Sequence, residues 1–190
     1  LRAYLQADSE RYPASAHRMM FTSNHDENSW AGTEFERMGD AAATMAALTY
    51  VLPQSMPLIY TGQEVGYDHR FEFFEKDPMP AWEPNEWTEF YTRLNAMRHA
   101  NPALASGGKG GEMAYMGGAL ADIMAFTRIL GDNKVVCFFN LSAEPQAVIP
   151  TVEVAGDFTD ALTGEPRSIV AGEEFALAPW EYAILVKSAF

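Results

Sequence analysis

The sequence predicts an α/β segment followed by an antiparallel β-sandwich. In the first half, helical patterns alternate with two short and continuously apolar runs, which is typical of strands in a parallel sheet. In the second half, short apolar or alternating runs recur with turn sequences between them, which is typical of a sandwich. The composition changes near "GGKGG", so we expect one domain over 1–105 and a second over 106–190.

The composition narrows the class of protein. The 190 residues are 48% hydrophobic, enough to bury a sizeable core, and the net charge is −13. This acidity argues against a nucleic-acid or an anionic-membrane partner, which would require a basic face. Cys137 lies in the apolar run "VVCFF", where a small core residue is the expected interpretation, and one cysteine does not fix the compartment.

The first half reads as two helix–strand units and a third helix. In order, the expected elements are a helix over 1–9, a strand over 18–24, a loop over 25–32, a helix over 33–52, a strand over 56–60, a long loop over 61–84 and a helix from 85. Thr33 and Glu36 form a capping box that begins the second helix, and Pro53 ends it. The run Met56–Tyr60 is continuously apolar, which predicts a strand covered on both faces.

A stretch without charges, 41–63, is not expected to cross a membrane. Pro53 and Pro57 interrupt it, and each half is shorter than the roughly 20 residues that a spanning helix needs.

The second half contains six apolar or alternating runs that we expect to be strands: 112–116, 122–130, 134–141, 146–150, 174–178 and 182–187. We expect the sandwich core to include Phe126, Val136, Phe138, Leu177, Ile184 and Val186.

A polar pair, His25 and Asp26, follows the first predicted strand. Ligands of parallel α/β folds bind at the carboxyl ends of the strands, so a functional role fits this position. The alternative is an Asp that caps a helix or a turn beside a hydrogen-bonded His, and the dipeptide alone leaves both interpretations open.

Several separate motifs carry a family resemblance. "FTSNHDEN", then "MPLIYTGQE", then a helix ending in "NPAL", then a closing "LAPWEYAILV" occur in that order. Together they resemble the alpha-amylase family, glycoside hydrolase family thirteen. The resemblance implies the last two strand–helix units of a (β/α)₈ TIM barrel, followed by the family's C-terminal antiparallel β-sandwich domain.

The resemblance also implies residue roles. Asp26 matches the family's carboxylate that stabilises the transition state, and His25 matches a histidine that binds the sugar at the cleaved bond. Such chemistry needs hydrogen bonds to sugar hydroxyls while positive charge develops on the ring. Asn28 and Trp30 are further substrate-binding candidates. Trp30 and four more aromatic residues in the loop could stack on sugars or simply pack the loop: Tyr67, Phe73, Phe74 and Trp82.

The nucleophile and the general acid of a retaining glycosidase are not found in this chain. In the family they follow the fourth and fifth barrel strands, and residues 1–23 hold no matching strand; Asp8 and Glu10 lie outside the family's motif. We therefore expect a C-terminal fragment of a glycoside hydrolase that acts on an alpha-glucan or a maltooligosaccharide. The start at Leu1 agrees with this, and the chain is expected to be inactive alone.

We expect no metal site in this chain, and a partner that covers the incomplete barrel. His17, His69 and His99 show no zinc-ligand spacing, no cofactor is implied, and the calcium sites of many relatives lie upstream of this segment. A partly built barrel would leave the strand Met56–Tyr60 as an open edge, so the partner should be the missing N-terminal barrel portion or a second copy. A stand-alone, non-catalytic module that binds carbohydrate or protein is the competing hypothesis.

Overall fold

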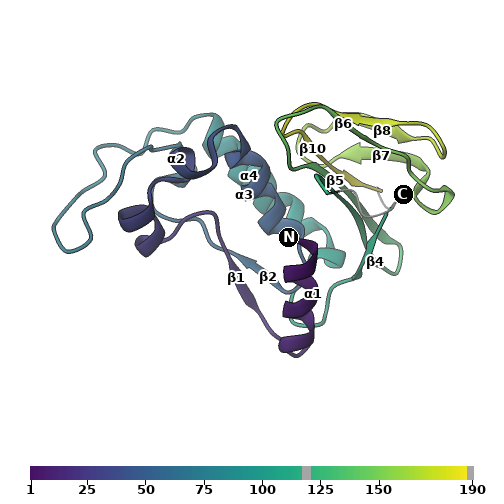
Figure 1. The fold of residues 1–190 in the computed structure, drawn as a ribbon, viewed down its shortest axis with the longest axis horizontal. Coiled ribbons are helices and arrows are strands. Elements are labelled where there is room, and N and C mark those ends of the chain that lie inside the picture. The colour runs from purple at the N-terminus through teal and green to yellow at the C-terminus, as the bar shows by residue number, and fades with distance from the viewer. Residues whose placement is uncertain (117–120, 188–190) are drawn as a thin grey trace.

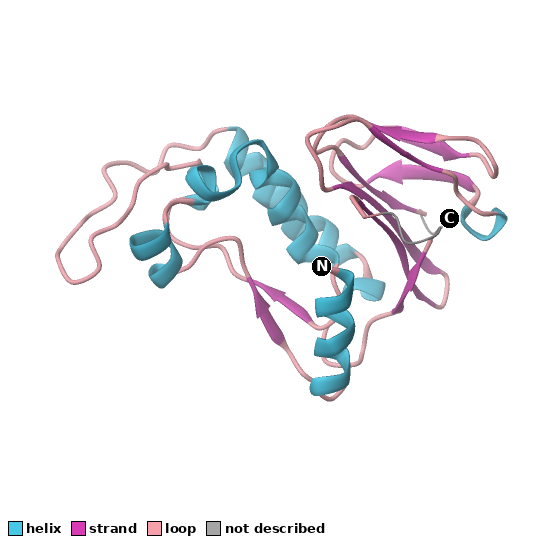
Figure 2. Ribbon diagram, in the orientation of Figure 1, coloured by secondary structure: helices cyan, strands magenta, loops and turns pink. Residues whose placement is uncertain are grey.

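The computed structural model describes residues 1–116 and 121–187. Helices α3 (Ala42–Val51) and α4 (Glu86–Ala100) run through the middle of the molecule, as Figure 1 shows. A short strand pair and helix α1 (Arg2–Arg11) lie to one side of them, and the second half forms a body of strands on the other. Figure 2 shows that helices dominate the first half and strands the second.

The two strands of the first half pair in parallel, as their apolar runs predict. Strand β1 (Arg18–Met20) lies beside β2 (Ser55–Pro57), with Met19 opposite Met56. Both strands are shorter than expected, and the prediction that 56–60 is covered on both faces is wrong. Met19 is 53% exposed and Met56 is 49% exposed. Only one face of this two-stranded pair packs against the helices, so the other face keeps its apolar side chains in water.

The helix expected over 33–52 is broken in two. The capping box of Thr33 and Glu36 is confirmed and begins α2 (Glu34–Met38). Gly39 then adopts φ 52° and ψ −129°, which a residue with a side chain rarely adopts, and a 3₁₀ turn, Gly39–Ala41, leads into α3. The apolar spacing continues across the break, which is why periodicity alone does not reveal it.

The third predicted helix is confirmed. Asn85 caps α4 by accepting hydrogen bonds from the backbone N–H groups of Trp87 and Thr88. The expected apolar face is the one that packs: Tyr91, Leu94 and Met97 are buried, and Trp87 and Phe90 lie against the same core.

The second half consists of antiparallel strands. A six-stranded sheet has the order β3-β4-β5-β10-β7-β8, and β6 pairs with β9 in a separate two-stranded sheet. The bounds are β3 Glu112–Tyr115, β4 Ile123–Leu130, β5 Asn133–Asn140, β6 Gln146–Val148, β7 Gly156–Asp160, β8 Pro166–Ile169, β9 Phe175–Leu177 and β10 Tyr182–Val186. All six expected runs contain a strand. Strands β7 and β8 are not predicted, because "GDFTD" and "PRSI" carry one large apolar residue each and give no alternation.

The six-stranded sheet is packed on both faces. One face, which includes Phe126 and Ile184, joins the core formed by helices α3 and α4. The other face, which includes Val136 and Phe138, packs with Leu177 of β9 in a second core. The expected core residues are thus buried but divided between two cores, because neighbouring residues of a strand point to opposite faces. Val186 is only half-buried.

A buried arginine ties the two halves together. The Arg128 side chain is 1% exposed and donates hydrogen bonds to the carbonyls of Gly111 and Val51, each at 2.8 Å. Across the described ranges, no helix has the length and apolar character needed to cross a membrane.

Candidate functional site

The segment after β1 is a helical turn rather than the expected loop. The Asn24 side chain accepts a hydrogen bond from the Glu27 backbone N–H at 2.8 Å, and its carbonyl accepts one from the Asn28 N–H at 2.9 Å. A π-helical turn, Glu27–Ala31, follows. The sequence does not predict this turn, because Asn24, which starts it, falls within the predicted strand 18–24.

His25 and Asp26 lie at the start of this turn. Their side chains are 69% and 61% exposed, and His25 Nε2 lies 3.6 Å from Asp26 Oδ2. Asp26 makes no capping hydrogen bond, since Asn24 fills that role. Within the described residues, the His25 ring is the one polar partner of the Asp26 carboxylate, which therefore remains open to a ligand.

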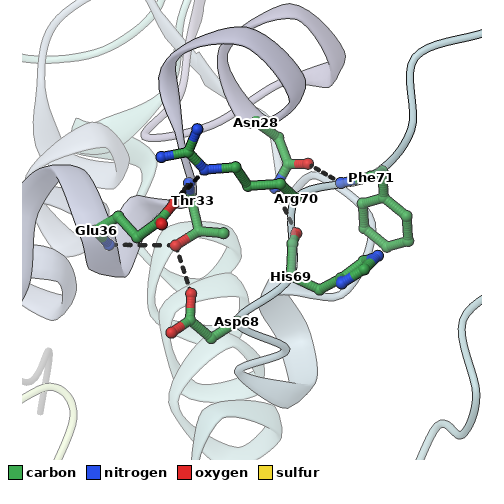
Figure 3. Close-up of polar contacts among 7 residues, drawn as sticks. All are labelled: Asn28, Thr33, Glu36, Asp68, His69, Arg70 and Phe71. Atoms are coloured by element: carbon green, nitrogen blue, oxygen red, sulfur yellow. Dashed lines mark hydrogen bonds and ion pairs between the residues drawn. The ribbon is translucent and has the colours of Figure 1, made fainter.

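Asn28 is buried beneath this surface, with 3% of it exposed. Its side-chain amide bonds to the loop that follows β2: Nδ2 donates to the His69 carbonyl at 2.9 Å, and Oδ1 accepts from the Phe71 N–H at 2.8 Å. Figure 3 shows both bonds. At 3% exposure, Asn28 presents little of its side chain to a substrate. The geometry makes Asn28 a clamp between two segments far apart in the sequence.

Two further pairs join the same two segments (Figure 3). Thr33 Oγ1 donates to Asp68 Oδ1 at 2.5 Å, and Arg70 Nε donates to Glu36 Oε2 at 2.6 Å. The hydrogen bond from Arg70 lowers the pKa of the Glu36 carboxyl, with a second contribution from the Thr33 N–H. Gly32 allows the close approach: it has φ +120°, and a Cβ there would lie 2.9 Å from Glu36 Oε2.

The segment of the long loop between His69 and Asp77 is closed by contacts between its two ends. Asp77 Oδ2 lies 2.8 Å from His69 Nε2 and accepts a hydrogen bond from the Glu72 N–H at 3.0 Å. The Glu72 N–H and then the His69 ring lower the pKa of the Asp77 carboxyl. The loop between His69 and Asp77 is thus closed by contacts at its base.

Aromatic rings line the same region in two groups. Tyr67 and Phe71 pack with the His69 ring, which supports the loop-packing interpretation for Tyr67. Trp30, Phe73 and Phe74 gather at the surface instead. Trp82 is exposed and stands apart from these rings among the described contacts.

A buried polar layer lies below the site. Gln63 accepts from the Tyr60 N–H at 2.7 Å and donates to Thr22 Oγ1 at 2.8 Å, which links the segments after β2 and β1. Glu34 is buried beside it, and desolvation raises the pKa of its carboxyl. Glu64 has a buried oxygen, Oε2, without a partner among the described residues.

Sequence reasoning did not identify Gln63, Asp68 or Arg70 as site residues, because each acts through a partner at least 28 positions away. The one signal in the sequence for this close approach is Gly32, which lies directly after the turn. In 1–116 and 121–187, no three His, Cys, Asp or Glu side chains gather closely enough to hold a metal ion.

Comparisons with known proteins support the resemblance that the motifs indicate. No protein-family profile matches the chain. The chain is 29% identical over 160 residues to alpha-amylase MalA of Haloarcula japonica, a match that covers 82% of this chain and 22% of that protein. It is 32% identical over 150 residues to neopullulanase 2 of Thermoactinomyces vulgaris, covering 75% of this chain and 24% of that protein. The chain thus spans about a quarter of the length of the curated relatives it matches.

Solved structures share the fold. A maltogenic alpha-amylase, AmyB from Thermotoga neapolitana, superimposes with a TM-score of 0.78 at 18% identity, covering all of this chain and 45% of that one. The protein AmyP, solved in complex with maltose, has a TM-score of 0.65 at 21% identity, covering 95% of this chain and 43% of that one. Over most of its length, this chain is similar to alpha-amylase-family glycoside hydrolases, consistent with the C-terminal portion of that family.

Proposed function

We propose that this chain is the C-terminal part of a retaining glycoside hydrolase that cleaves alpha-glucans, and that Asp26 stabilises its transition state. The observation that carries the proposal is the position of Asp26. It follows the Asn24 cap and His25, just beyond a parallel strand, and its carboxylate is exposed without a capping role.

The proposed chemistry follows from this position. Glycoside cleavage passes through an oxocarbenium-like state, and a fixed carboxylate beside the ring is stabilising when positive charge develops there. His25 Nε2, 3.6 Å from Asp26, would donate to a sugar hydroxyl. Trp30 would contact the substrate at the edge of the same turn, and Asn28 would act by holding the backbone.

The architecture belongs to the same proposal. We assign 1–105 to the last two strand–helix units of a (β/α)₈ barrel and 106–190 to a C-terminal β-sandwich. The parallel pair β1–β2, with helices α3 and α4 against one face, supports the first assignment. The core between the six-stranded sheet and β9 supports the second.

The reaction needs two groups that this chain does not supply in the family's motifs. A nucleophile and a general acid, about 5–5.5 Å apart, start a retaining reaction. They would come from the rest of the barrel, which would also cover Met19 and Met56. Alpha-glucans are the proposed substrates, because relatives are amylases and AmyP was solved with maltose.

The competing function is a non-catalytic module that binds carbohydrate through the same surface. The exposed aromatic rings beside His25 favour some carbohydrate contact under either function. The two functions differ in whether the complete protein hydrolyses the glucan that it binds.

Proton NMR of the first products separates them. The complete protein that carries this chain is incubated with maltoheptaose, and the anomers are followed within minutes. The proposal predicts hydrolysis with the α-anomer appearing first, as retention requires. Initial release of the β-anomer would contradict the retaining mechanism, and glucan binding without hydrolysis would favour the module.

A further inference from the structure

A second hollow, away from the candidate site, lies where helices α3 and α4 meet the glycine-rich segment 106–111. Its volume is about 470 Å³, and its wall includes these side chains: His17, Tyr50, Asn95, Arg98, His99 and Ser106. His17 comes directly before strand β1, whereas His25 and Asp26 follow that strand. The hollow therefore borders the end of β1 opposite to the candidate site.

The charged side chains of this hollow are basic. Among the described residues, its wall contains one arginine and two histidines, and neither an Asp nor a Glu. The whole chain has 26 acidic and only 13 basic residues, so a wall without carboxylates is unusual for this molecule. Salt limits the reach of exposed charges to roughly 8–10 Å, so the acidity of the rest of the chain does not prevent this hollow from attracting an anion.

Arg98 places a fixed positive charge in the wall. It donates hydrogen bonds to the Tyr50 carbonyl at 2.6 Å and to Ser106 Oγ at 2.7 Å, and a third to the carbonyl of Ser55. All three acceptors are neutral, and Arg98 Nε has no acceptor within the described residues. Desolvation lowers the pKa of the guanidinium, which reflects the cost of burying a cation without a counter-ion. An anion in the hollow would supply that counter-ion.

Three further side chains offer hydrogen-bond donors to the same hollow. Asn95 Oδ1 accepts from the Tyr50 hydroxyl at 3.2 Å, while the Asn95 Nδ2 amide and the His17 and His99 rings have no partner in the described part of the chain. The His17 ring is held against the glycine-rich segment: Gly107 has φ +69°, and a Cβ there would lie 2.5 Å from His17 Nε2. The donors thus surround one space without using one another.

This set of donors fits a phosphate group. A phosphate has several acceptor oxygens and a negative charge, and guanidinium and imidazolium groups bind it through charge-assisted hydrogen bonds. A metal cation is disfavoured by the positive charge and by the lack of carboxylates in the described wall. A neutral sugar also fits less well, because Tyr50, whose ring could otherwise stack on it, is 2% exposed.

We propose that His17, Asn95, Arg98 and His99 form a binding site for a phosphate group. The site is separate from the proposed hydrolase centre, since it shares no residue with the turn after β1 or the loop after β2. His17 and the α4 residues lie 78 or more positions apart in the sequence, so the site exists only in the folded chain.

Isothermal titration calorimetry of the complete protein with inorganic phosphate tests the site, with sodium chloride used to hold the ionic strength constant. We expect saturable binding in the millimolar range. His17→Ala and His99→Ala should each weaken it roughly three- to fivefold, and the double variant about tenfold, because each change removes one exposed, charge-assisted contact. Arg98 is left intact, since it also holds the end of α3.

Lys109→Ala is the matched control. It removes one positive charge from the neighbouring segment, but Lys109 is exposed and does not line the hollow, so the phosphate affinity should not change. Circular dichroism of each variant establishes that the fold is retained. Glycerol 3-phosphate is the second probe. Tighter binding than inorganic phosphate, lost in the double variant, would support the site with a phosphomonoester as its ligand; equal binding would support it with the free ion.

Three results would overturn the inference. One is the absence of saturable phosphate binding by the unaltered protein. The second is equal affinity of the double variant and the unaltered protein, which would place the phosphate elsewhere. The third is a loss in Lys109→Ala as large as in the histidine variants, which would reduce the effect to overall charge. None of these results bears on glucan hydrolysis, so the proposed function would stand.

Discussion

Replacing Asn28 with alanine should release the long loop without unfolding the molecule. The Asn28 amide makes one hydrogen bond of 2.9 Å to the His69 carbonyl and one of 2.8 Å from the Phe71 N–H, in a site that is 3% exposed. Loss of the bond to the His69 carbonyl costs about 1 kcal/mol net, and the buried Phe71 N–H left without a partner costs roughly a further 1–3 kcal/mol. The free energy that opposes loop opening should therefore fall by roughly 2–4 kcal/mol.

Amide hydrogen exchange measures this change directly. Every 1.4 kcal/mol corresponds to a factor of ten, so the Phe71 amide should exchange roughly 30- to 700-fold faster in Asn28→Ala. Amides of β5 (Asn133–Asn140) should be unaffected, because they lie outside the loop. Ser29→Ala is the control, since Ser29 is its neighbour and makes no side-chain hydrogen bond within the described residues. An unchanged Phe71 rate would refute the clamp.

Three other predictions follow from buried groups and exposed faces. Desolvation raises the pKa of Glu34 above its ordinary 4.5, so the folded state holds this proton more tightly than the unfolded state. The Glu34 contribution to the free energy of unfolding should therefore fall as pH rises above about 4.5. Urea titrations at several pH values should show that fall in the unaltered chain and not in Glu34→Gln. The same pH dependence of stability in both proteins would contradict the burial argument. Arg128→Ala should lower the free energy of unfolding, measured by urea titration, by roughly 3–5 kcal/mol, because two buried carbonyls lose a charged donor and a cavity forms. The control Lys109→Ala, at an exposed position, should change the free energy of unfolding little. The 190-residue chain should show no glycosidase activity on starch or aryl glucosides, and measurable hydrolysis would refute this. The chain should also self-associate through the open face at Met19 and Met56, and a monodisperse monomer in light scattering would refute that.

Local signals in the sequence were sufficient for much of the fold. The capping box at Thr33, the Asn85 cap and the apolar face of α4 depend on residues within one or two turns, and the structure has them as predicted. The six recognised strands alternate or carry long apolar runs. The break at Gly39 was not predicted, because the apolar spacing resumes in register after it. Strands β7 and β8 pair with each other and so need little apolar sequence of their own.

In the candidate site, too, local features could be predicted and long-range contacts could not. His25 and Asp26 are candidate site residues because of their place after a strand and their match to the family motif, and this assignment stays a prediction. The clamp at Asn28 and the Glu36–Arg70 pair could not, because these contacts join positions 34 to 43 residues apart and depend on how the loop folds back. Exposure was also unpredictable for Trp30 and Tyr67, because both fall in stretches predicted as loops. The first lies on the surface, and the second packs beside His69.

Turnover of Asp26→Asn in the complete protein tests the central claim most directly. The substituted amide would keep the shape of the carboxylate and lose its charge, and the wild-type carboxylate is 61% exposed with one polar contact among the described residues, so the melting temperature should not change. The loss of one transition-state contact of this kind corresponds to roughly 10²–10³-fold in kcat on maltodextrin, or more. A fall of that size with an unchanged fold is the result that the account predicts. Near-normal turnover would contradict it and would leave Asp26 a surface residue of the turn.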